Sequence, residues 1–232
     1  MIFNETVKSD SNPVDRTEKF MFDGERLIQH IIKQRYFEEE ISNEVNLSYS
    51  DNQVTVTTDY LTLVYTLNSE GYASQCVYSL SSQNRIYQFS YSAEGYLTGI
   101  VENIDDTEYS STSLTYENGD ITSISSKMNG LENKFIYEPG EESSTYHLPC
   151  LGLLEIHPLT FHIEALYAGL LGKDPRHFTM HSCPAGSNDE KTVYSYGFDK
   201  KGNPSRMICQ TTYAGGQASY YPYTRNISIS FE

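Results

Sequence analysis

The sequence predicts an all-β protein: a long antiparallel meander of repeated hairpins, curled into a half-barrel or barrel-like sheet, with one buried helix near residues 158–171. Three observations support this fold class. A turn motif recurs along the chain, apolar residues alternate with polar ones between the turns, and one apolar segment carries helix start and stop signals. The length of 232 residues fits one large domain, as is typical of β-sandwiches and barrels.

The turn motif recurs every 24 residues and is clearest in segments 89–100 and 113–124. In both segments a glycine is followed at the same offsets by an aliphatic residue, a threonine and an isoleucine. The glycines of three successive copies are Gly71, Gly95 and Gly119, and degenerate copies lie at 20–27, 49–54 and 198–207. Because glycine accepts the positive φ that tight turns require, we expect the three glycines at hairpin tips.

Apolar and aromatic residues fall on one face at period two in several segments, which predicts roughly fourteen strands. The clearest alternating sets are Val45, Leu47 and Tyr49, then Tyr87, Phe89 and Tyr91, then Ile227, Ile229 and Phe231. Leu97 and Ile100 are three positions apart, as are Ile121 and Ile124, so on a regular strand the two members of each pair would point to opposite faces. The return strands therefore either carry a bulge or are half-buried on both faces.

The repeat is interrupted between about 139 and 190. Here Pro158 opens an apolar run, Gly172 follows its last apolar residue and Pro175 lies just beyond, which predicts a helix over 158–171. The helix is too short to span a bilayer and too apolar for a surface, so we expect it on the concave side of the sheet. Residues 1–16 are predicted to be a flexible tail, and 17–232 a single β-hairpin-repeat domain with a helical insert at about 139–190.

Charge and hydropathy exclude several classes of function. The net charge of −15 and the pI near 4.7 argue against nucleic-acid binding and against anionic membrane surfaces. No stretch approaches the roughly 18 apolar residues of a membrane-spanning helix. The N-terminus shows neither a basic region nor an apolar core of a secretory signal.

The turn pattern aromatic-Asp-x-x-Gly-x-aliphatic, clearest at 198–204, resembles the tyrosine-aspartate repeat of Rhs-type surface proteins. The Asp is present at Asp23, Asp51 and Asp199 but is replaced at Ser92 and Glu117. Over about residues 17–138 and 192–232 the chain is similar to uncharacterised cell-envelope lipoproteins of Gram-negative gut anaerobes, a domain of unknown function with a porin-like fold. This resemblance implies an exported, lipid-anchored protein, in the periplasm or at the outer-membrane surface, whose signal and anchor cysteine precede this chain. It carries over no catalytic or binding residues.

Five of the six histidines and two of the four cysteines cluster in the interrupted region. They are His147, Cys150, His157, His162, His177, His181 and Cys183. Zinc prefers these ligand types, which gives the alternative hypothesis of a metal-dependent hydrolase or a zinc-stabilised domain using His147, Cys150, His177, His181 and Cys183. On a strand His177 and His181 would lie about 13 Å apart, so only an irregular loop could gather them with Cys183.

A competing hypothesis pairs Cys150 with Cys183 in a disulfide around the helix. Closing a loop of about 34 residues would stabilise the fold by roughly 3.5 to 4 kcal/mol in the chain-entropy model. The two hypotheses exclude each other. A mass loss of about 2 Da under denaturing, non-reducing conditions would indicate the disulfide, and a gain of about 63 Da in native spray would indicate zinc.

Support for catalysis is weaker. The sequence has no Gly-x-Ser-x-Gly elbow, no phosphate-binding glycine loop and no His-Glu-x-x-His motif. The carboxylate pairs Asp105–Asp106 and Glu141–Glu142 are interpreted as solvated polar segments. Tyrosine is abundant, at 20 copies, and the segment Tyr213–Tyr223 is the best candidate for an exposed aromatic loop that binds a glycan or peptide through Tyr220, Tyr221 and Tyr223.

The sequence as a whole predicts a non-enzymatic binding or structural module of the bacterial cell envelope. No catalytic residue, cofactor or metal ligand is assigned, and the partner is unknown. Elemental analysis distinguishes this prediction from the metal-dependent alternative, because that alternative requires stoichiometric zinc.

Overall fold

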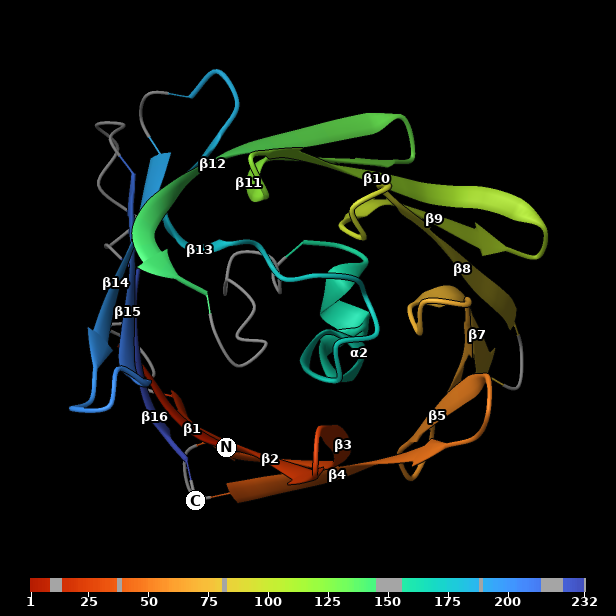
Figure 1. Cartoon of the computed structure of the whole chain (residues 1–232), viewed down its shortest axis with the longest axis horizontal. Helices are drawn as coiled ribbons and strands as arrows, with labels where there is room; N and C mark the ends of the chain where they lie inside the picture. The colour runs from red at the N-terminus through yellow and green to blue at the C-terminus, as the bar shows by residue number, and fades with distance from the viewer. Residues whose placement is uncertain are drawn as a thin grey trace.

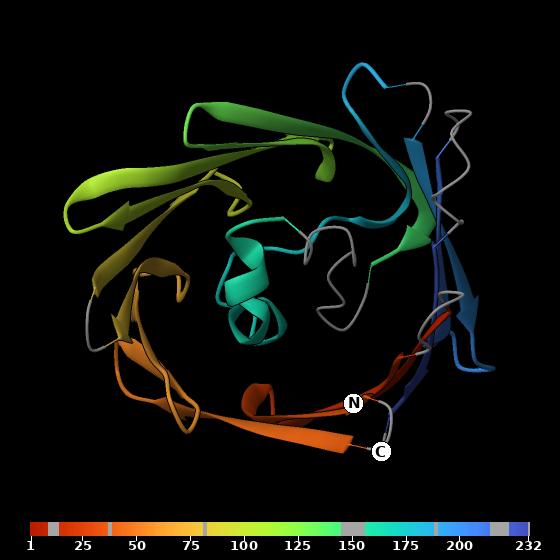
Figure 2. The ribbon, with the colours of Figure 1, turned by 180° about the vertical axis from the view of Figure 1, so that it is seen from behind.

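The chain folds into a closed β-barrel, which Figure 1 shows end-on as a ring of strands around a short helical segment. This computed structural model describes residues 1–8, 14–36, 39–80, 83–144, 156–187, 190–213 and 223–231. Each strand pairs antiparallel with its neighbours in sequence, and the first strand pairs with the last to close the ring. The view from behind shows the same closed ring (Figure 2). The predicted all-β fold and barrel-like sheet are therefore confirmed.

The described residues form two more strands than the roughly fourteen predicted. The strands are β1 (Ile2–Lys8), β2 (Val14–Asp23), β3 (Arg26–Tyr36), β4 (Glu39–Tyr49), β5 (Gln53–Thr57), β6 (Thr62–Leu67), β7 (Ala73–Leu80), β8 (Gln83–Tyr91), β9 (Leu97–Ile104), β10 (Thr107–Glu117), β11 (Asp120–Met128), β12 (Leu131–Ser143), β13 (His177–Pro184), β14 (Glu190–Phe198), β15 (Pro204–Tyr213) and β16 (Tyr223–Ser230). Between β12 and β13 lie the 3₁₀ helix η1 (Leu159–Phe161) and the helix α2 (Ile163–Tyr167).

The prediction of a flexible tail over residues 1–16 is wrong. That segment contains β1 and the start of β2, and β1 pairs with β16 over the seven positions from Ile2 to Lys8. The Met1 amino group also donates a hydrogen bond of 2.9 Å to the Phe20 carbonyl. The sequence does not reveal this strand because its partner β16 lies at the opposite end of the chain.

The three repeated glycines lie at hairpin tips, as predicted. Gly71, Gly95 and Gly119 follow β6, β8 and β10 and have φ values of 85°, 91° and 89°. Because a meander reverses direction at every turn, these three tips lie at the same end of the barrel. We call this end the hairpin-tip end.

In several hairpin tips, one side-chain oxygen near the start of the turn accepts two backbone hydrogen bonds. Asn68 Oδ1 accepts hydrogen bonds from the backbone N–H groups two and four positions later, at 2.9 and 3.0 Å. Ser92 Oγ accepts the equivalent pair at 3.3 Å each, and Asp199 Oδ1 accepts its pair at 2.8 and 2.9 Å. Asn, Ser and Asp are therefore interchangeable at the first turn position, because each offers a short side-chain acceptor.

A bulge follows each of the three tips. The strand register skips Ser74 in β7, Thr98 in β9 and Thr122 in β11, positions that are again 24 residues apart. One extra residue reverses the parity of the strand, so Leu97 and Ile100 are both buried. The parity conflict in the sequence is thus resolved in favour of bulges.

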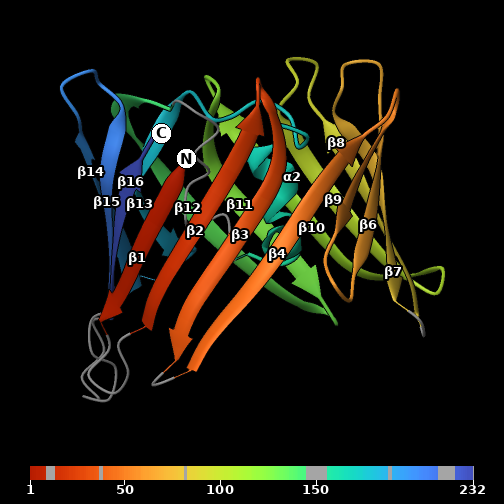
Figure 3. The ribbon, with the colours of Figure 1, turned by 90° about the horizontal axis from the view of Figure 1, so that it is seen from below.

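The inner face of the barrel wall is mainly apolar, with a few buried polar side chains such as Glu102. The outer face is mainly polar, with a few apolar neighbours such as Val64 and Val77. On β4, Val45 and Leu47 are buried, whereas Glu44, Asn46 and Ser48 between and beside them are exposed. Barrels with this many strands enclose a lumen too wide for wall side chains alone to fill. Residues 156–176, which lead into β13, occupy this space, as the side view in Figure 3 shows for α2. We refer to these residues as the lumen insert.

The helix in the insert is shorter than predicted: α2 covers Ile163–Tyr167 rather than most of 158–171. Gly169 at φ 69° ends it, because its N–H bonds the Leu166 carbonyl and the next N–H bonds the Ala165 carbonyl in a Schellman motif. Within the described part of the chain, no helix combines the length and apolarity needed to cross a bilayer.

The exit of the insert binds the hairpin tips through backbone hydrogen bonds. Leu170 O accepts from Ala73 N at 2.8 Å, just after the Gly71 tip, and Lys173 N donates to Gly95 O at 2.9 Å. Arg176 N donates to Gly119 O at 3.0 Å. Successive contacts are therefore three residues apart along the insert and about one 24-residue repeat apart along the wall.

This close contact predicts that Gly172→Ala is more damaging than Gly130→Ala. Both glycines have positive φ, 89° and 79°, but a Cβ at Gly172 would lie 2.6 Å from the Gly95 carbonyl oxygen, whereas one at Gly130 meets nothing within 4 Å. We expect Gly172→Ala to lose about 1–3 kcal/mol more unfolding free energy, measured by urea denaturation. Equal losses would contradict the tight seating of the insert exit.

Candidate functional site

The histidine-rich insert is the region to which the sequence points, and it lies in the barrel lumen. His147 and Cys150 fall outside the described residues, as do 214–222 of the aromatic segment, so the Cys150–Cys183 disulfide and the Tyr220–Tyr223 ligand site stay predictions. The remaining candidates are placed as follows: His157 before η1, His162 before α2, and His177, His181 and Cys183 on β13.

The structure does not gather the β13 candidates into a metal centre. His177 Nδ1 lies 2.9 Å from Asp120 Oδ2, and His181 Nδ1 lies 2.9 Å from Glu138 Oε2. Each histidine thus has a different carboxylate partner on the wall. Across the described ranges, no group of three or more His, Cys, Asp or Glu residues is arranged to hold a metal ion.

His157 anchors the start of the insert to β9 and β10. Its Nε2 lies 2.5 Å from Glu102 Oε2, which also accepts a 2.7 Å hydrogen bond from Ser110 Oγ. Burial would raise the pKa of Glu102, but hydrogen bonds from His157 and Ser110 and the nearby Arg85 outweigh burial and lower the pKa. A fully buried carboxylate therefore stays ionised between two donors and a cation.

His162 is fully buried and contacts three aromatic rings of the wall. Its Nδ1 lies 2.8 Å from the Tyr65 hydroxyl, and its ring meets those of Tyr87 and Phe89 edge to face. Burial lowers the pKa of His162 to about 3. The imidazole is therefore neutral and shares a hydrogen bond with the Tyr65 hydroxyl.

His30 is a lumen residue that sequence reasoning missed. Its Nε2 lies 2.9 Å from Glu18 Oε2 and its Nδ1 2.8 Å from Glu164 Oε1 on α2. Burial would lower the pKa of His30, but the hydrogen bonds to Glu164 and Glu18 outweigh burial and raise the pKa. Only the imidazolium can donate from both nitrogens, so a buried positive charge joins α2 to the wall.

The repeat could have located His30. The register of β2 with β3 skips Ile28, just as it skips one residue after the later tips. His30 follows buried Leu27 by three positions, as Ile100 follows Leu97 and Ile124 follows Ile121. Extending the alignment past the Gly24 turn would therefore have placed His30 at an inward position.

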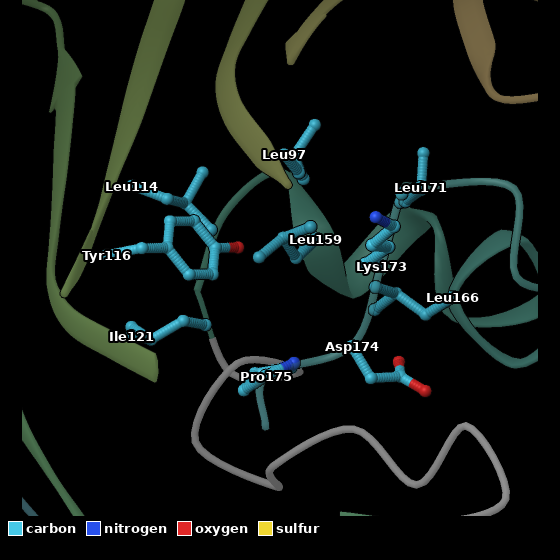
Figure 4. Close-up of a pocket in the computed structure, with 11 residues that line it drawn as sticks. Leu97, Leu114, Tyr116, Ile121, Leu159, Leu166, Leu171, Lys173, Asp174 and Pro175 are labelled. Carbon is cyan, nitrogen blue, oxygen red and sulfur yellow. The ribbon is translucent and has the colours of Figure 1, made fainter. Parts of the chain in front are cut away.

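A small cavity of about 30 Å³ separates the insert from β9, β10 and β11 at the hairpin-tip end (Figure 4). Its lining is mostly apolar and includes Leu97, Leu159 and Leu166. Its polar groups come from two sides, Tyr116 on the wall and Lys173 and Asp174 on the insert. This volume accommodates about one water molecule. The cavity is thus a packing space between insert and wall.

A larger hollow of about 290 Å³ lies where β13 and β14 diverge. Only two residue pairs, at His181 and Ser182, join these strands in the described register. Phe178, Tyr194 and Tyr196 line the hollow, and Phe178 stacks on Tyr196 with ring centroids 4.6 Å apart. The strand β13, which continues directly from the insert, separates from β14 at this point.

These contacts are hydrogen bonds and ion pairs that join the insert to the wall. The described histidines of the insert and of β13 each contact a carboxylate or phenol from a different strand. The backbone carbonyl of His157 also accepts hydrogen bonds from Thr112 and Ser126 at 3.1 Å each. The arrangement therefore serves docking of the insert.

His162 predicts a loss of stability in acid. The unfolded histidine binds a proton near pH 6.5, but the folded one resists protonation down to about pH 3, so stability falls as pH drops below 6.5. The expected contribution is about 1.4 kcal/mol per pH unit. His162→Gln should remove this slope in urea denaturation between pH 6.5 and 4, whereas His181→Gln, on the outer face, should retain it. Parallel curves for wild type and His162→Gln would contradict the buried neutral imidazole.

His30 predicts the opposite pH dependence. Its folded pKa is raised above 6.5, so its stabilisation is complete below pH 6.5 and is lost as pH rises through the folded pKa. His30→Gln should lose roughly 3 kcal/mol at pH 6, because the partly buried Glu164 and Glu18 lose the imidazolium between them, and only Glu18 keeps a second cation, Arg16 at 2.7 Å. The difference from wild type should shrink at pH 9. Lys33→Gln, which removes a side chain 57% exposed, should change stability by less than about 0.5 kcal/mol.

Comparison with solved structures gives two close matches in fold. A porin-like protein from Bacteroides uniformis ATCC 8492 matches with a TM-score of 0.88 and 28% sequence identity, covering 100% of this chain and 95% of that chain. A porin-like protein from Bacteroides vulgatus ATCC 8482 matches with a TM-score of 0.62 and 11% identity, covering 99% and 97%. At that identity the second match shows the fold alone. No curated protein matches the chain.

The family comparison covers most of the chain. The family described as "Domain of unknown function (DUF4595) with porin-like fold" matches residues 20–206. This range includes β3 to β14 and the whole lumen insert. The chain therefore belongs to this family of porin-like domains of unknown function.

Proposed function

We propose that the protein is a non-enzymatic binding or structural module of the bacterial cell envelope. In this proposal the closed barrel is a rigid body whose lumen is packed by its own insert and whose outer wall faces water. The observation that carries the proposal is the polarity of the wall, mainly apolar inside and mainly polar outside.

The outer face supports contact with water. Cross-strand neighbours that point outward include Ser48 with Thr55 and Thr66 with Gln75, alternating with buried Leu47, Val54 and Tyr65. A transmembrane barrel carries the reverse pattern, with an apolar band outside and a polar interior. The alternation in this chain therefore favours a wall immersed in water over one embedded in lipid.

The interior supports a packing role for the insert. Ala165, Tyr167 and Leu171 of the insert are at most 4% exposed and belong to the same apolar core as the wall residues. An insert packed in this way occupies space in the lumen that an open channel would need. The pairing of insert histidines with wall side chains likewise favours docking over catalysis.

The proposed location is the cell envelope. Both solved relatives are described as porin-like proteins from Bacteroides. The resemblance to cell-envelope lipoproteins, and to the turn chemistry of Rhs-type repeats, supports export to the periplasm or outer-membrane surface with a lipid anchor. Cell fractionation of the native host, with metabolic labelling by a palmitate analogue, tests location and anchor separately.

The hollow between β13 and β14 is the described surface best suited to a glycan or peptide ligand. It combines the stacked rings of Phe178 and Tyr196 with the polar side chains of Glu142 and His181. Aromatic rings beside hydrogen-bonding groups are a common composition of ligand sites. Loss of binding in Tyr196→Ala, retained in Tyr60→Ala at the exposed β5–β6 turn, would support the assignment.

The proposal predicts that the purified chain neither inserts into membranes nor conducts solutes. Vesicles of phosphatidylethanolamine and phosphatidylglycerol are mixed with the protein, floated on a density gradient and assayed for sugar flux. We expect the protein to stay with the aqueous fraction and the flux to equal that of protein-free vesicles. An outer-membrane porin is the positive control. Co-flotation with solute flux would refute the water-facing barrel, and one equivalent of zinc by elemental analysis would instead support the metal-stabilised alternative.

A further inference from the structure

The junction between β13 and β14, which we call the β13–β14 seam, has the fewest residue pairs of any two neighbouring strands in the described register. Two pairs join these strands, at His181 and Ser182, whereas nine pairs join β14 to β15. Continuing the register of the seam would pair Thr179 with Ser195, but these two residues do not pair. Beyond Val193, β14 therefore has a paired neighbour, β15, on one side only among the described strands.

Side chains connect β13 to β14 where the backbone pairing stops. The Tyr196 hydroxyl donates a 2.8 Å hydrogen bond to the Thr179 carbonyl. The hydroxyls of Tyr194 and Ser182 lie 3.1 Å apart. The hollow of about 290 Å³ lies at this place, where β13 arrives from the lumen, as Figure 1 shows. The seam is therefore a gap between two strand backbones that tyrosine side chains bridge.

The backbone of β14 suits an added strand. A strand with a neighbour on one side only offers backbone donors and acceptors to an extended chain on its other side. Gly197 lies inside β14, and a glycine within a strand often marks the close approach of another backbone. Ser195 is exposed and has a small side chain. A glycan carries no regular series of donors and acceptors at the strand spacing, so this edge favours a peptide.

The lining of the hollow favours apolar side chains on one face of the added strand. Successive residues of a strand point to opposite faces, so every second residue of the peptide would point inward. These residues would meet Phe178 and Tyr196, which stack with ring centroids 4.6 Å apart, and the buried Tyr194. Contact between apolar side chains and these rings is favourable because it removes apolar surface from water.

The outward face of the added strand would meet a carboxylate. Glu142 lines the hollow and is exposed. His181 also lines it, and its Nδ1 lies 2.9 Å from a carboxylate oxygen of Glu138. Arg206 lies one strand further away, on β15 opposite Gly197. The net charge of −15 adds a long-range attraction for cations, so basic side chains are favoured on this face of the peptide.

We propose that the β13–β14 seam binds an extended peptide with alternating basic and apolar side chains, which adds as a strand to the edge of β14 beyond Val193. This inference rests on the proposed binding function and narrows its ligand from a glycan or peptide to an extended peptide. Backbone hydrogen bonds to β14 supply the affinity, and the rings of Phe178 and Tyr196 select the apolar side chains.

The first test uses the intact protein and three acetylated, amidated hexapeptides of the same residues. They are alternating Lys-Val-Lys-Val-Lys-Val, the block isomer Lys-Lys-Lys-Val-Val-Val, and the alternating peptide with N-methyl groups on its valines. Calorimetry should show that the alternating peptide binds about tenfold or more tightly than either control, because the controls lose the alternation or the backbone donors. Its binding should slow amide exchange in residues 194–198. Equal affinity for all three, no binding at about 1 mM, or protection only elsewhere would overturn the proposal.

A matched pair of charge variants gives a second test. Glu142→Lys reverses the charge at the hollow, whereas Glu44→Lys makes the same change at an exposed position of β4, which does not line the hollow. At low salt the Kd of the alternating peptide should rise by about three- to tenfold in Glu142→Lys and by less than about twofold in Glu44→Lys. Equal changes would overturn the proposal.

Two further outcomes are distinguishable. A dimer in light scattering whose contact protects residues 194–198 would make a second copy of the chain the occupant and would overturn the proposal. Absence of peptide binding by a protein that stays in the aqueous fraction and holds no zinc would overturn strand addition alone. Insertion into vesicles would instead overturn the proposed function.

Discussion

The fold depends on filling the barrel lumen, which is too wide for the side chains of the wall alone to fill. Side chains from opposite walls of such a barrel do not meet, so the apolar inner face needs a second partner. The insert supplies it, with Leu159, Ala165 and Leu171 buried against the wall. A segment threaded through an apolar lumen also brings backbone and histidine groups that need hydrogen-bond partners. The wall supplies such partners at Glu102, Tyr65 and His30, each on a different strand, so packing and polar pairing select the same position for the insert.

Much of the wall can be predicted from the sequence because its rules are local. A turn glycine with positive φ and a side-chain acceptor three residues before it, as at Ser92 and Gly95, fix the hairpin tip within five residues. The bulge lies at the same distance after the turn glycine in each copy, so the repeat also predicts which positions of the return strand point inward. The fold class and the three tips are accordingly confirmed, and the bulge accounts for the parity of Leu97 and Ile100.

The remaining features depend on contacts between residues far apart in sequence. The strand β1 exists because β16 and β2 flank it, and nothing in its own polar sequence indicates that pairing. The helix ends at Gly169, where the Schellman motif closes it, rather than at Gly172, which packs against the Gly95 carbonyl of the wall. The histidine cluster was identified from composition, but its partners Asp120 and Glu138 come from β11 and β12, and sequence spacing within the cluster carries no information about them.

The same architecture suggests where this family can vary its function. Fold alone does not define function, and sites are usually carried by loops on a rigid scaffold. At the hairpin tips, the first and fourth positions are constrained by the turn oxygen and the glycine, as in Asp199 and Gly202. The two positions between them are exposed: Ala93 and Glu94 in one tip, Lys200 and Lys201 in another. Two tips at the same end of the barrel therefore carry opposite charges on the same turn geometry, and the rim of the barrel can change its chemistry while the packed lumen stays the same.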